Sequence, residues 1–180
     1  MLPVRSLEKC VATQVLLERT ITVILIAYDG SADAQAAIDR AGELMNGQPV
    51  TVLTVWERLM DVLARTGAGL GIGDVDADSA DRSSEDEARQ RAEEGAERAE
   101  RAGLKPRART CPRERSIAAT ILAQADEVSA SAIVMGTRGL TGLKSFLLGS
   151  VSHNVLQHAD RPVLVVPSPA TASERAAHRP

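Results

Sequence analysis

Short, almost wholly apolar runs constrain the fold of this chain more than any other feature of its sequence. Residues 21–27 read ITVILIA, residues 50–55 read VTVLTV, residues 132–135 read AIVM and residues 162–166 read PVLVV. Unbroken runs rich in β-branched residues are typical of strands that are buried on both faces, as in parallel sheets. A fifth, weaker strand is predicted over Lys105–Thr110, and its proline and arginines favour the edge of a sheet.

Segments with helical periodicity separate these strands. Ser31 is a good N-cap, Asp33 favours the first turn after it, and Asn46-Gly47 ends this helix. Ser84-x-x-Glu87 resembles a capping box and predicts a helix over about residues 84–102. Two more helices are predicted over Ser116–Val128 and over about residues 150–159.

The alternation of strands and helices predicts the fold class. Apolar strands that alternate with amphipathic helices form a parallel sheet with right-handed crossovers. We therefore expect an α/β protein with a five-stranded parallel sheet, doubly wound in the order 3-2-1-4-5, with helices on both faces. The chain then reverses direction between strands 1 and 4, and ligands bind outside the carboxyl ends of the strands at such a switch point.

The chain is interpreted as one domain with an extension at each end and an irregular loop inside it. Residues 1–19 are interpreted as an N-terminal extension, residues 20–168 as one domain, and residues 169–180, rich in Ala, Arg and Pro, as a disordered tail. Residues 57–80 hold four glycines and a string of aspartates and are expected to be an irregular loop.

Composition excludes several classes of function. Aromatic residues are only 2% of the chain and the net charge is −3, which argues against a nucleic-acid-binding surface. The apolar runs are shorter than the roughly 18–20 residues that span a bilayer, so no membrane association is expected. The two cysteines, Cys10 and Cys111, form no CxxC pair, which favours reduced thiols and a cytoplasmic location.

A glycine-rich loop follows the predicted fourth strand. Gly136-Thr137-Arg138-Gly139 is separated by nine residues from Gly149-Ser150, which opens the last of these helices. Glycines let backbone amides approach an anion, and a helix N-terminus adds oriented N–H groups and partial positive charge. Arg138 and Lys144 offer cations. The loop therefore predicts a polyphosphate site.

The spacing Gly-x-x-Gly, nine residues, Gly-Ser resembles the ATP-binding signature of the universal stress protein family, and the resemblance runs from Ile21 to Ser168. It implies that Asp29 accepts hydrogen bonds from the ribose and that the Val55 backbone meets the adenine edge. It implies apolar contacts to the base from Ala27 and Met135. The phosphates, with any Mg²⁺ that they carry, would be held by Gly136, Gly139, Gly149, Ser150 and Val151, beside Arg138. An Asx turn at the start of the helix is the alternative role for Asp29.

The resemblance also frames the expected function. It favours a regulatory ATP-binding protein that signals through partner contacts, with no catalytic residues and no metal ligands of its own. The alternatives are a slow ATPase, a self-phosphorylating protein with Thr141, Ser150 or Ser152 as acceptor, or a cyclic AMP binder. The apolar edge strand 163–166 predicts a homodimer, because an open apolar edge needs a cover and the family commonly pairs this way.

Overall fold

The computed structural model describes residues 22–67, 76–140 and 148–177. The predicted extension 1–19 and the candidate acceptor Thr141 lie outside them. Along the chain, the elements are β1 (Val23–Ala27), α2 (Ala32–Leu44), β2 (Pro49–Trp56), α3 (Leu59–Thr66), α4 (Ala77–Arg101), β3 (Lys105–Pro112), α5 (Ile117–Glu127), β4 (Ala130–Gly136), α6 (Ser150–His158), β5 (Val163–Val166) and α7 (Pro169–Ala177).

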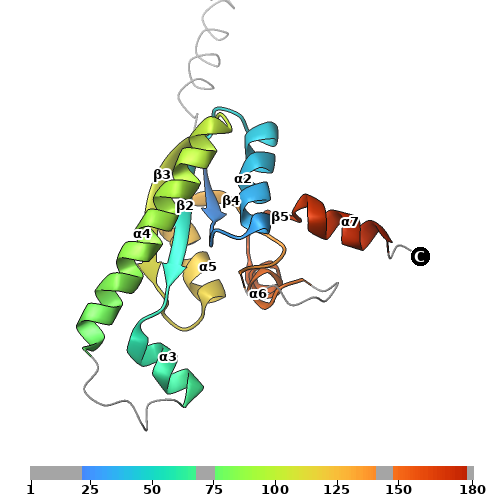
Figure 1. The fold of residues 1–180 in the computed structure, drawn as a ribbon. Helices are drawn as coiled ribbons and strands as arrows, with labels where there is room; N and C mark the ends of the chain where they lie inside the picture. Colours follow the sequence, from blue (N-terminus) through green and yellow to red (C-terminus); the bar gives the residue numbers. More distant parts are fainter. Residues whose placement is uncertain (1–21, 68–75, 141–147, 178–180) are drawn as a thin grey trace, which may run out of the picture.

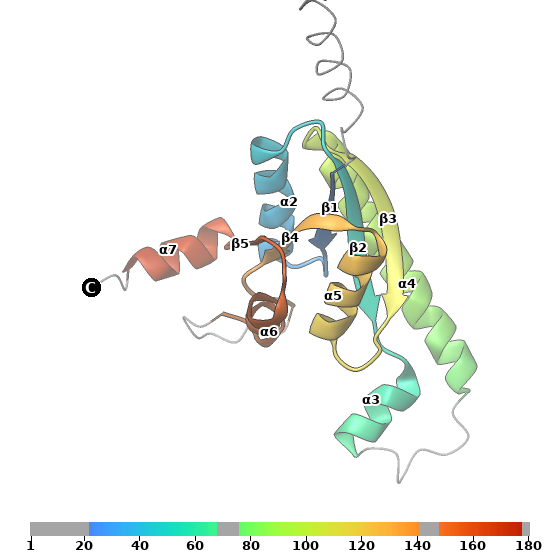
Figure 2. The ribbon, with the colours of Figure 1, turned by 180° about the vertical axis from the view of Figure 1, so that it is seen from behind.

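The five strands form one parallel sheet in the order β3-β2-β1-β4-β5, as the sequence predicted. Helices α2 and α4 cover one face of the sheet, and α5 and α6 cover the other (Figures 1 and 2). β1 is central, since Ile26 is in register with Val52 of β2 and with Val134 of β4. The prediction that β3 lies at an edge is confirmed.

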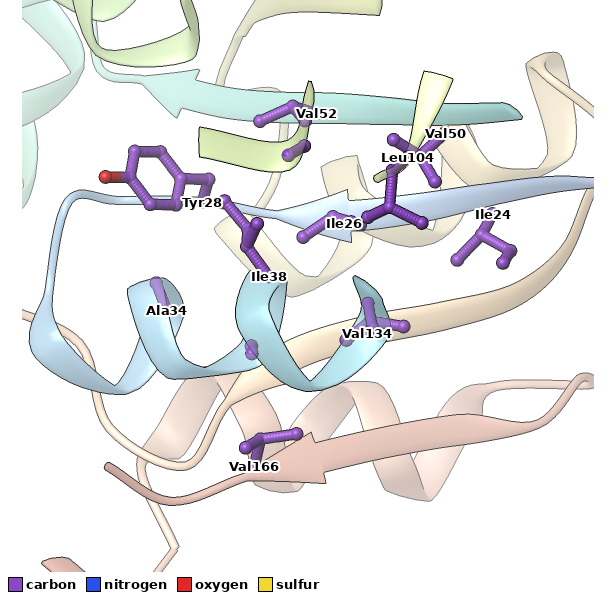
Figure 3. Packing of buried hydrophobic residues seen from close by; sticks show 13 residues of the cluster. Ile24, Ile26, Tyr28, Ala34, Ile38, Val50, Val52, Leu104, Val134 and Val166 are labelled. Atoms are coloured by element: carbon purple, nitrogen blue, oxygen red, sulfur yellow. The ribbon is translucent and has the colours of Figure 1, made fainter. Parts of the chain in front are cut away.

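Successive side chains of β1 lie on opposite faces of the sheet and pack into two different hydrophobic clusters. Ile24 and Ile26 pack under α2 and α4, in the cluster that Figure 3 shows. Leu25 packs on the opposite face with residues of α5 and α6. This burial on both faces explains why the run has no polar alternation.

Helix α4 lies close to the sheet at Gly95. A Cβ atom there would stand 2.7 Å from Tyr28 Cδ1 and 2.9 Å from Val52 Cγ1. Four alanines on the same side of α4 are buried or half-buried: Ala88, Ala92, Ala96 and Ala99. The small side chains therefore set the distance between this helix and the strands.

The expectation of an irregular loop over residues 57–80 was wrong for most of the part that the structure describes. Helix α3 occupies Leu59–Thr66, and α4 begins at Ala77 rather than near residue 84. The N-cap of α4 is Asp76, whose side chain accepts a hydrogen bond from Ser79 N at 3.1 Å, so the predicted capping box at Ser84 lies inside the helix. Asp81 of α4 also accepts from the Leu59 N–H at 2.7 Å, which holds the two helices together.

The disordered tail predicted over residues 169–180 is also corrected, because Pro169–Ala177 form helix α7. Ser168 Oγ accepts a hydrogen bond from Thr171 N at 3.3 Å, and Pro169 follows it at a position where helices tolerate proline. The richness in Ala, Arg and Pro indicated disorder, but the cap and the hydrogen bonds of this segment to Asp33 of α2 order it.

Within the described ranges, none of the helices combines the length and the apolar character needed to cross a bilayer.

Candidate functional site

A cavity of about 250 Å³ opens at the carboxyl ends of β1, β2 and β4, where the sheet topology changes direction. The structure brings all ten sequence-predicted site residues to its wall: Ala27, Asp29, Val55, Met135, Gly136, Arg138, Gly139, Gly149, Ser150 and Val151. Sequence reasoning missed six further wall residues: Tyr28, Ala34, Leu53, Ile117, Ile121 and Leu148. Ser152, which the sequence suggested only as a phosphate acceptor, also lines the wall. The sequence predicts a helix over Ser116–Val128, but it could not reveal that Ile117 and Ile121 of this helix face the cavity.

The apolar end of the cavity lies where β1 leaves the sheet. Tyr28 N donates to Leu53 O at 2.9 Å, just past the last β1–β2 register pair. Alternate residues of a strand direct their backbone groups to the same side, so the N–H and C=O of Val55 face the side that β1 has vacated. Trp56 O faces the other way and accepts from Arg113 N. Val55 can therefore offer one donor and one acceptor to a ligand.

Tyr28 contributes to this wall as a neutral group. Its hydroxyl donates to Glu94 Oε1 at 3.0 Å. Burial, and after it this hydrogen bond, raise the pKa of Tyr28 to about 12. The phenol therefore stays protonated at physiological pH.

Asp29 joins the two loops that border the cavity. Its Oδ1 accepts from Ser31 N at 3.0 Å, so the Asx turn that was the alternative role for Asp29 is present. Its Oδ2 accepts from Leu140 N at 3.1 Å, in the glycine-rich loop. A carboxylate oxygen has more than one lone pair, so Asp29 can accept further hydrogen bonds from a ligand.

The glycine-rich segment is tied to the start of α6. Gly149 N donates to Thr137 O at 2.8 Å, and Ser152 Oγ donates to Gly136 O at 2.9 Å. Ser152 is only 4% exposed and its hydroxyl is engaged, which argues against it as a phosphate acceptor. Ser150 is exposed at the cavity wall.

The first turn of α6 gives the cavity an anion-binding end. The first backbone N–H groups of a helix have no partners within the helix, and they carry partial positive charge. Here they belong to Ser150, Val151 and Ser152, all of which line the cavity. Nowhere in the described ranges do three His, Cys, Asp or Glu side chains lie close enough together to hold a metal ion.

Arg138, the cation predicted for this end of the cavity, forms an ion pair with a residue of α7. Arg138 Nη1 lies 3.2 Å from Glu174 Oε2 of α7, and the Arg138 side chain is 15% exposed. Its buried Nε finds no hydrogen-bond partner among the described residues. Arg138 thus lines the cavity, but its charge is shared with the C-terminal helix.

Gly136 has a packing role that its place in the glycine motif conceals. A Cβ atom at this position would stand 2.7 Å from Asp33 C and 2.8 Å from Ala34 N, both backbone atoms of α2. Such contacts cannot be relieved by turning a side chain.

We expect Gly136→Ala to lower the free energy of unfolding by about 1–3 kcal/mol, because β4 and α2 would have to separate. Urea unfolding followed by circular dichroism measures this. Gly149→Ala is the matched control, since its closest contact would be a milder 3.1 Å. Equal stability of the Gly136 variant and the wild type would contradict the packing role.

Comparison with known families gives a match over most of the chain. The family model described as "Universal stress protein family" matches residues 20–167. A curated relative from Thermus aquaticus, "Universal stress protein in QAH/OAS sulfhydrylase 3'region", is 34% identical over 152 residues, which cover 79% of this chain and 96% of that protein. Universal stress protein YxiE of Bacillus subtilis is 54% identical over 46 residues, covering 26% of this chain and only 31% of that relative.

Solved structures share the fold. A universal stress protein from Arabidopsis thaliana with AMP bound has a TM-score of 0.56 and 17% identity, covering 84% of this chain and 94% of its own. The universal stress protein from Archaeoglobus fulgidus in complex with dAMP has a TM-score of 0.52 and 23% identity, and the match covers 81% of this chain and 96% of that chain. A universal stress protein in complex with cAMP has a TM-score of 0.54 and 24% identity, and the match covers 82% of this chain and 97% of that chain.

Proposed function

We propose, from the premise that the chain belongs to the universal stress protein family, that it is a regulatory protein that binds ATP in the cavity at the switch point. The observation that carries the proposal is the layout of this cavity. Its wall combines apolar side chains and the free backbone groups of Val55, which suit a base, with the Asp29 carboxylate, which suits a ribose, and the N-terminus of α6, which suits phosphates.

The base end suits adenine. Ala27 and Met135 are apolar neighbours for the ring, and Ile117 and Ile121 add further apolar surface from α5. The Val55 N–H and C=O would pair with the edge of adenine that carries one acceptor and one donor. Asp29 would then accept from the ribose hydroxyls.

The phosphate end would use backbone groups rather than a metal site of the protein. The amides of Ser150 and Val151 and the Ser150 hydroxyl would hold phosphate oxygens, with the backbone at Gly136, Gly139 and Gly149 leaving room for them. Mg²⁺ would be bound through the phosphates themselves. Because the described residues at the phosphate end of the wall include no evident group to activate water, we propose that ATP serves as a regulatory ligand in a cytoplasmic signalling protein.

Identifying the nucleotide that copurifies with the protein tests this function. The protein is denatured and the released nucleotide is separated by chromatography. We expect ATP. Cyclic AMP in its place would favour the cyclic-nucleotide alternative, and steady conversion of added ATP to ADP by the purified protein would favour the ATPase alternative.

The role of Asp29 leads to a second prediction. Asp29→Ala should weaken the binding of ATP by a factor roughly ten- to a hundredfold larger than for 2′,3′-dideoxy-ATP. The reason is that a hydrogen bond to a carboxylate contributes about 1.5–3 kcal/mol, and Asp29 can make one only when the ribose hydroxyls are present. Calorimetric titration with both ligands measures the difference. Ser31→Ala removes the cap of α2 and the hydrogen bond from Ser31 Oγ to Arg138 O, and neither group is proposed to contact the ribose, so it should weaken the binding of both ligands equally. If Asp29→Ala weakened the binding of ATP and of 2′,3′-dideoxy-ATP equally, Asp29 would have only its turn-forming role.

We also propose a homodimer formed through β5. This strand is at the edge of the sheet, and Val163, Leu164 and Val165 are only half-buried. Leu156 of α6, the helix that packs beside β5, is 44% exposed. A two-fold partner offering the same strand would cover this apolar surface, and Pro162 and Pro167 would confine the pairing to a short stretch.

A further inference from the structure

The carboxylate of Asp33 is the most highly connected buried side chain near the cavity. Asp33 is 5% exposed and lies in the first turn of α2. Its Oδ2 accepts from Arg138 N at 3.1 Å and from the Thr137 hydroxyl. Its Oδ1 accepts from Ser168 N and from Thr171 Oγ1, each at 3.0 Å.

The two oxygens therefore serve two different segments. Oδ2 fixes the backbone where β4 passes into the glycine-rich loop, and Oδ1 fixes the start of α7. Neither Asp33 nor Thr137 belongs to the cavity wall, which begins with their neighbours Ala34, Gly136 and Arg138. Asp33 thus lies directly behind the loop.

The electrostatics of Asp33 agree with a fixed, ionised acceptor. Burial alone would raise its pKa, but the hydrogen bonds from Ser168, Thr137 and Thr171 outweigh burial and hold the pKa below its usual value. The group therefore stays charged at physiological pH, and each of its hydrogen bonds is charge-assisted.

We propose that Asp33 is a positioning residue for the phosphate end of the nucleotide site. It acts through the backbone of Thr137 and Arg138 and sets where the loop and the start of α6 meet. The link to α6 is direct, since Gly149 N donates to Thr137 O at 2.8 Å and Gly149 is the N-cap of that helix. The inference rests on the proposed function, because it concerns affinity for the phosphates of the same ligand.

The segment that holds the other oxygen lies at the end of the family match. Residues 20–167 match the family model, whereas Ser168 and Thr171 follow it. Oδ1 is oriented by these two donors, so the position of the glycine-rich loop depends on the C-terminal helix as well as on α2. This gives α7 a defined role in the site although it lies outside the cavity.

Two variants test the proposal from the loop side. Thr137→Val keeps the shape of the side chain and removes one hydrogen bond to Oδ2. Asp33→Asn keeps the size, and the threonine hydroxyls can turn to accept from an amide, but the N–H groups of Arg138 and Ser168 cannot. Because these two N–H groups bond to different oxygens, one of them loses its acceptor in either orientation of the amide.

The readout is the affinity for ATP compared with adenosine, which has no phosphate. We expect ATP to bind about tenfold more weakly to Asp33→Asn and about threefold more weakly to Thr137→Val, with adenosine within about twofold of the wild type. Thr120→Val is the control. Its buried hydroxyl bonds to Ser116 O and Glu114 N, away from the loop, so both ligands should change by the same factor.

Equal losses of ATP and adenosine affinity in Thr137→Val, or no loss of ATP affinity in it, would overturn the positioning role while leaving the proposed function standing. Thr137→Val alone decides the matter if Asp33→Asn does not fold. A wild-type protein that binds neither ligand would overturn the proposed function, and the positioning role with it.

Discussion

Valine at both Gly139 and Gly149 will remove ATP binding while the protein stays folded. A Cβ atom at Gly139 would stand 2.7 Å from Asp29 Oδ2, and one at Gly149 would stand 3.1 Å from Thr137 O. The first side chain would displace the Asp29 carboxylate, which we propose accepts from the ribose, and the second would crowd the N-terminus of α6. Losing two charge-assisted hydrogen bonds at about 1.5–3 kcal/mol each predicts a fall in affinity of roughly 100-fold or more.

The measurement is a calorimetric titration of the double variant with ATP, alongside circular dichroism to verify the fold. Gly67→Val is the matched control, because Gly67 ends α3 away from the cavity and a Cβ atom there would have no neighbour within 4 Å. Its φ of +70° makes valine strained, so this control tests whether loss of stability alone weakens ATP binding. Unchanged ATP affinity in a folded double variant would contradict the site.

Proline at Val165 will convert the proposed dimer to monomers. Pro162 O accepts from Ile133 N and Val166 O accepts from Thr137 N, so the backbone groups of alternate residues face β4. The N–H and C=O of Val165 therefore face the free edge of β5. Proline removes that N–H without removing a β4–β5 hydrogen bond, which is the position where strands tolerate proline.

Sedimentation equilibrium at tens of micromolar measures the mass. The wild type should sediment at twice the chain mass of 19.1 kDa, and Val165→Pro at the chain mass. Val165→Thr keeps the N–H and the β-branched shape and should remain dimeric. A monomeric wild type, or a dimer that persists in the proline variant, would contradict pairing through β5.

The strands and their order were predictable from the sequence because burial on both faces leaves a direct trace in composition. ITVILIA and VTVLTV can hardly be solvent-exposed, and the connections between such strands follow known topological rules. The same rules placed Asp29 and Gly136 at one switch point before any side chain was located. All ten predicted site residues consequently line one cavity.

The helices that sequence reasoning missed are those stabilised by tertiary contacts. α3 is a short helix in which every residue is at least partly exposed, and it is joined to α4 by the hydrogen bond from Leu59 to Asp81. α7 has no large apolar side chain, and it is fixed at its start by Asp33, more than 130 positions earlier in the chain. Local helix propensity depends only on neighbouring residues in the sequence, so it cannot indicate partners that lie far away along the chain.

Two roles of site residues were hidden for a similar reason. Arg138 was predicted as a free cation, and its ion pair with Glu174 depends on a helix that the sequence did not reveal. Asp33 was interpreted only as a favourable residue for the first turn of a helix, whereas its four hydrogen bonds join segments that meet only in the folded chain.

The most direct test of the account is a calorimetric titration of nucleotide-free wild-type protein with ATP, adenosine and GTP under the same conditions. The layout of the cavity predicts one ATP per chain, weaker binding of adenosine because it lacks the phosphate contacts, and weaker binding of GTP because guanine reverses the donor and acceptor that Val55 meets. No heat of binding with ATP, or GTP binding as tightly as ATP, would contradict an adenine-nucleotide site at this switch point.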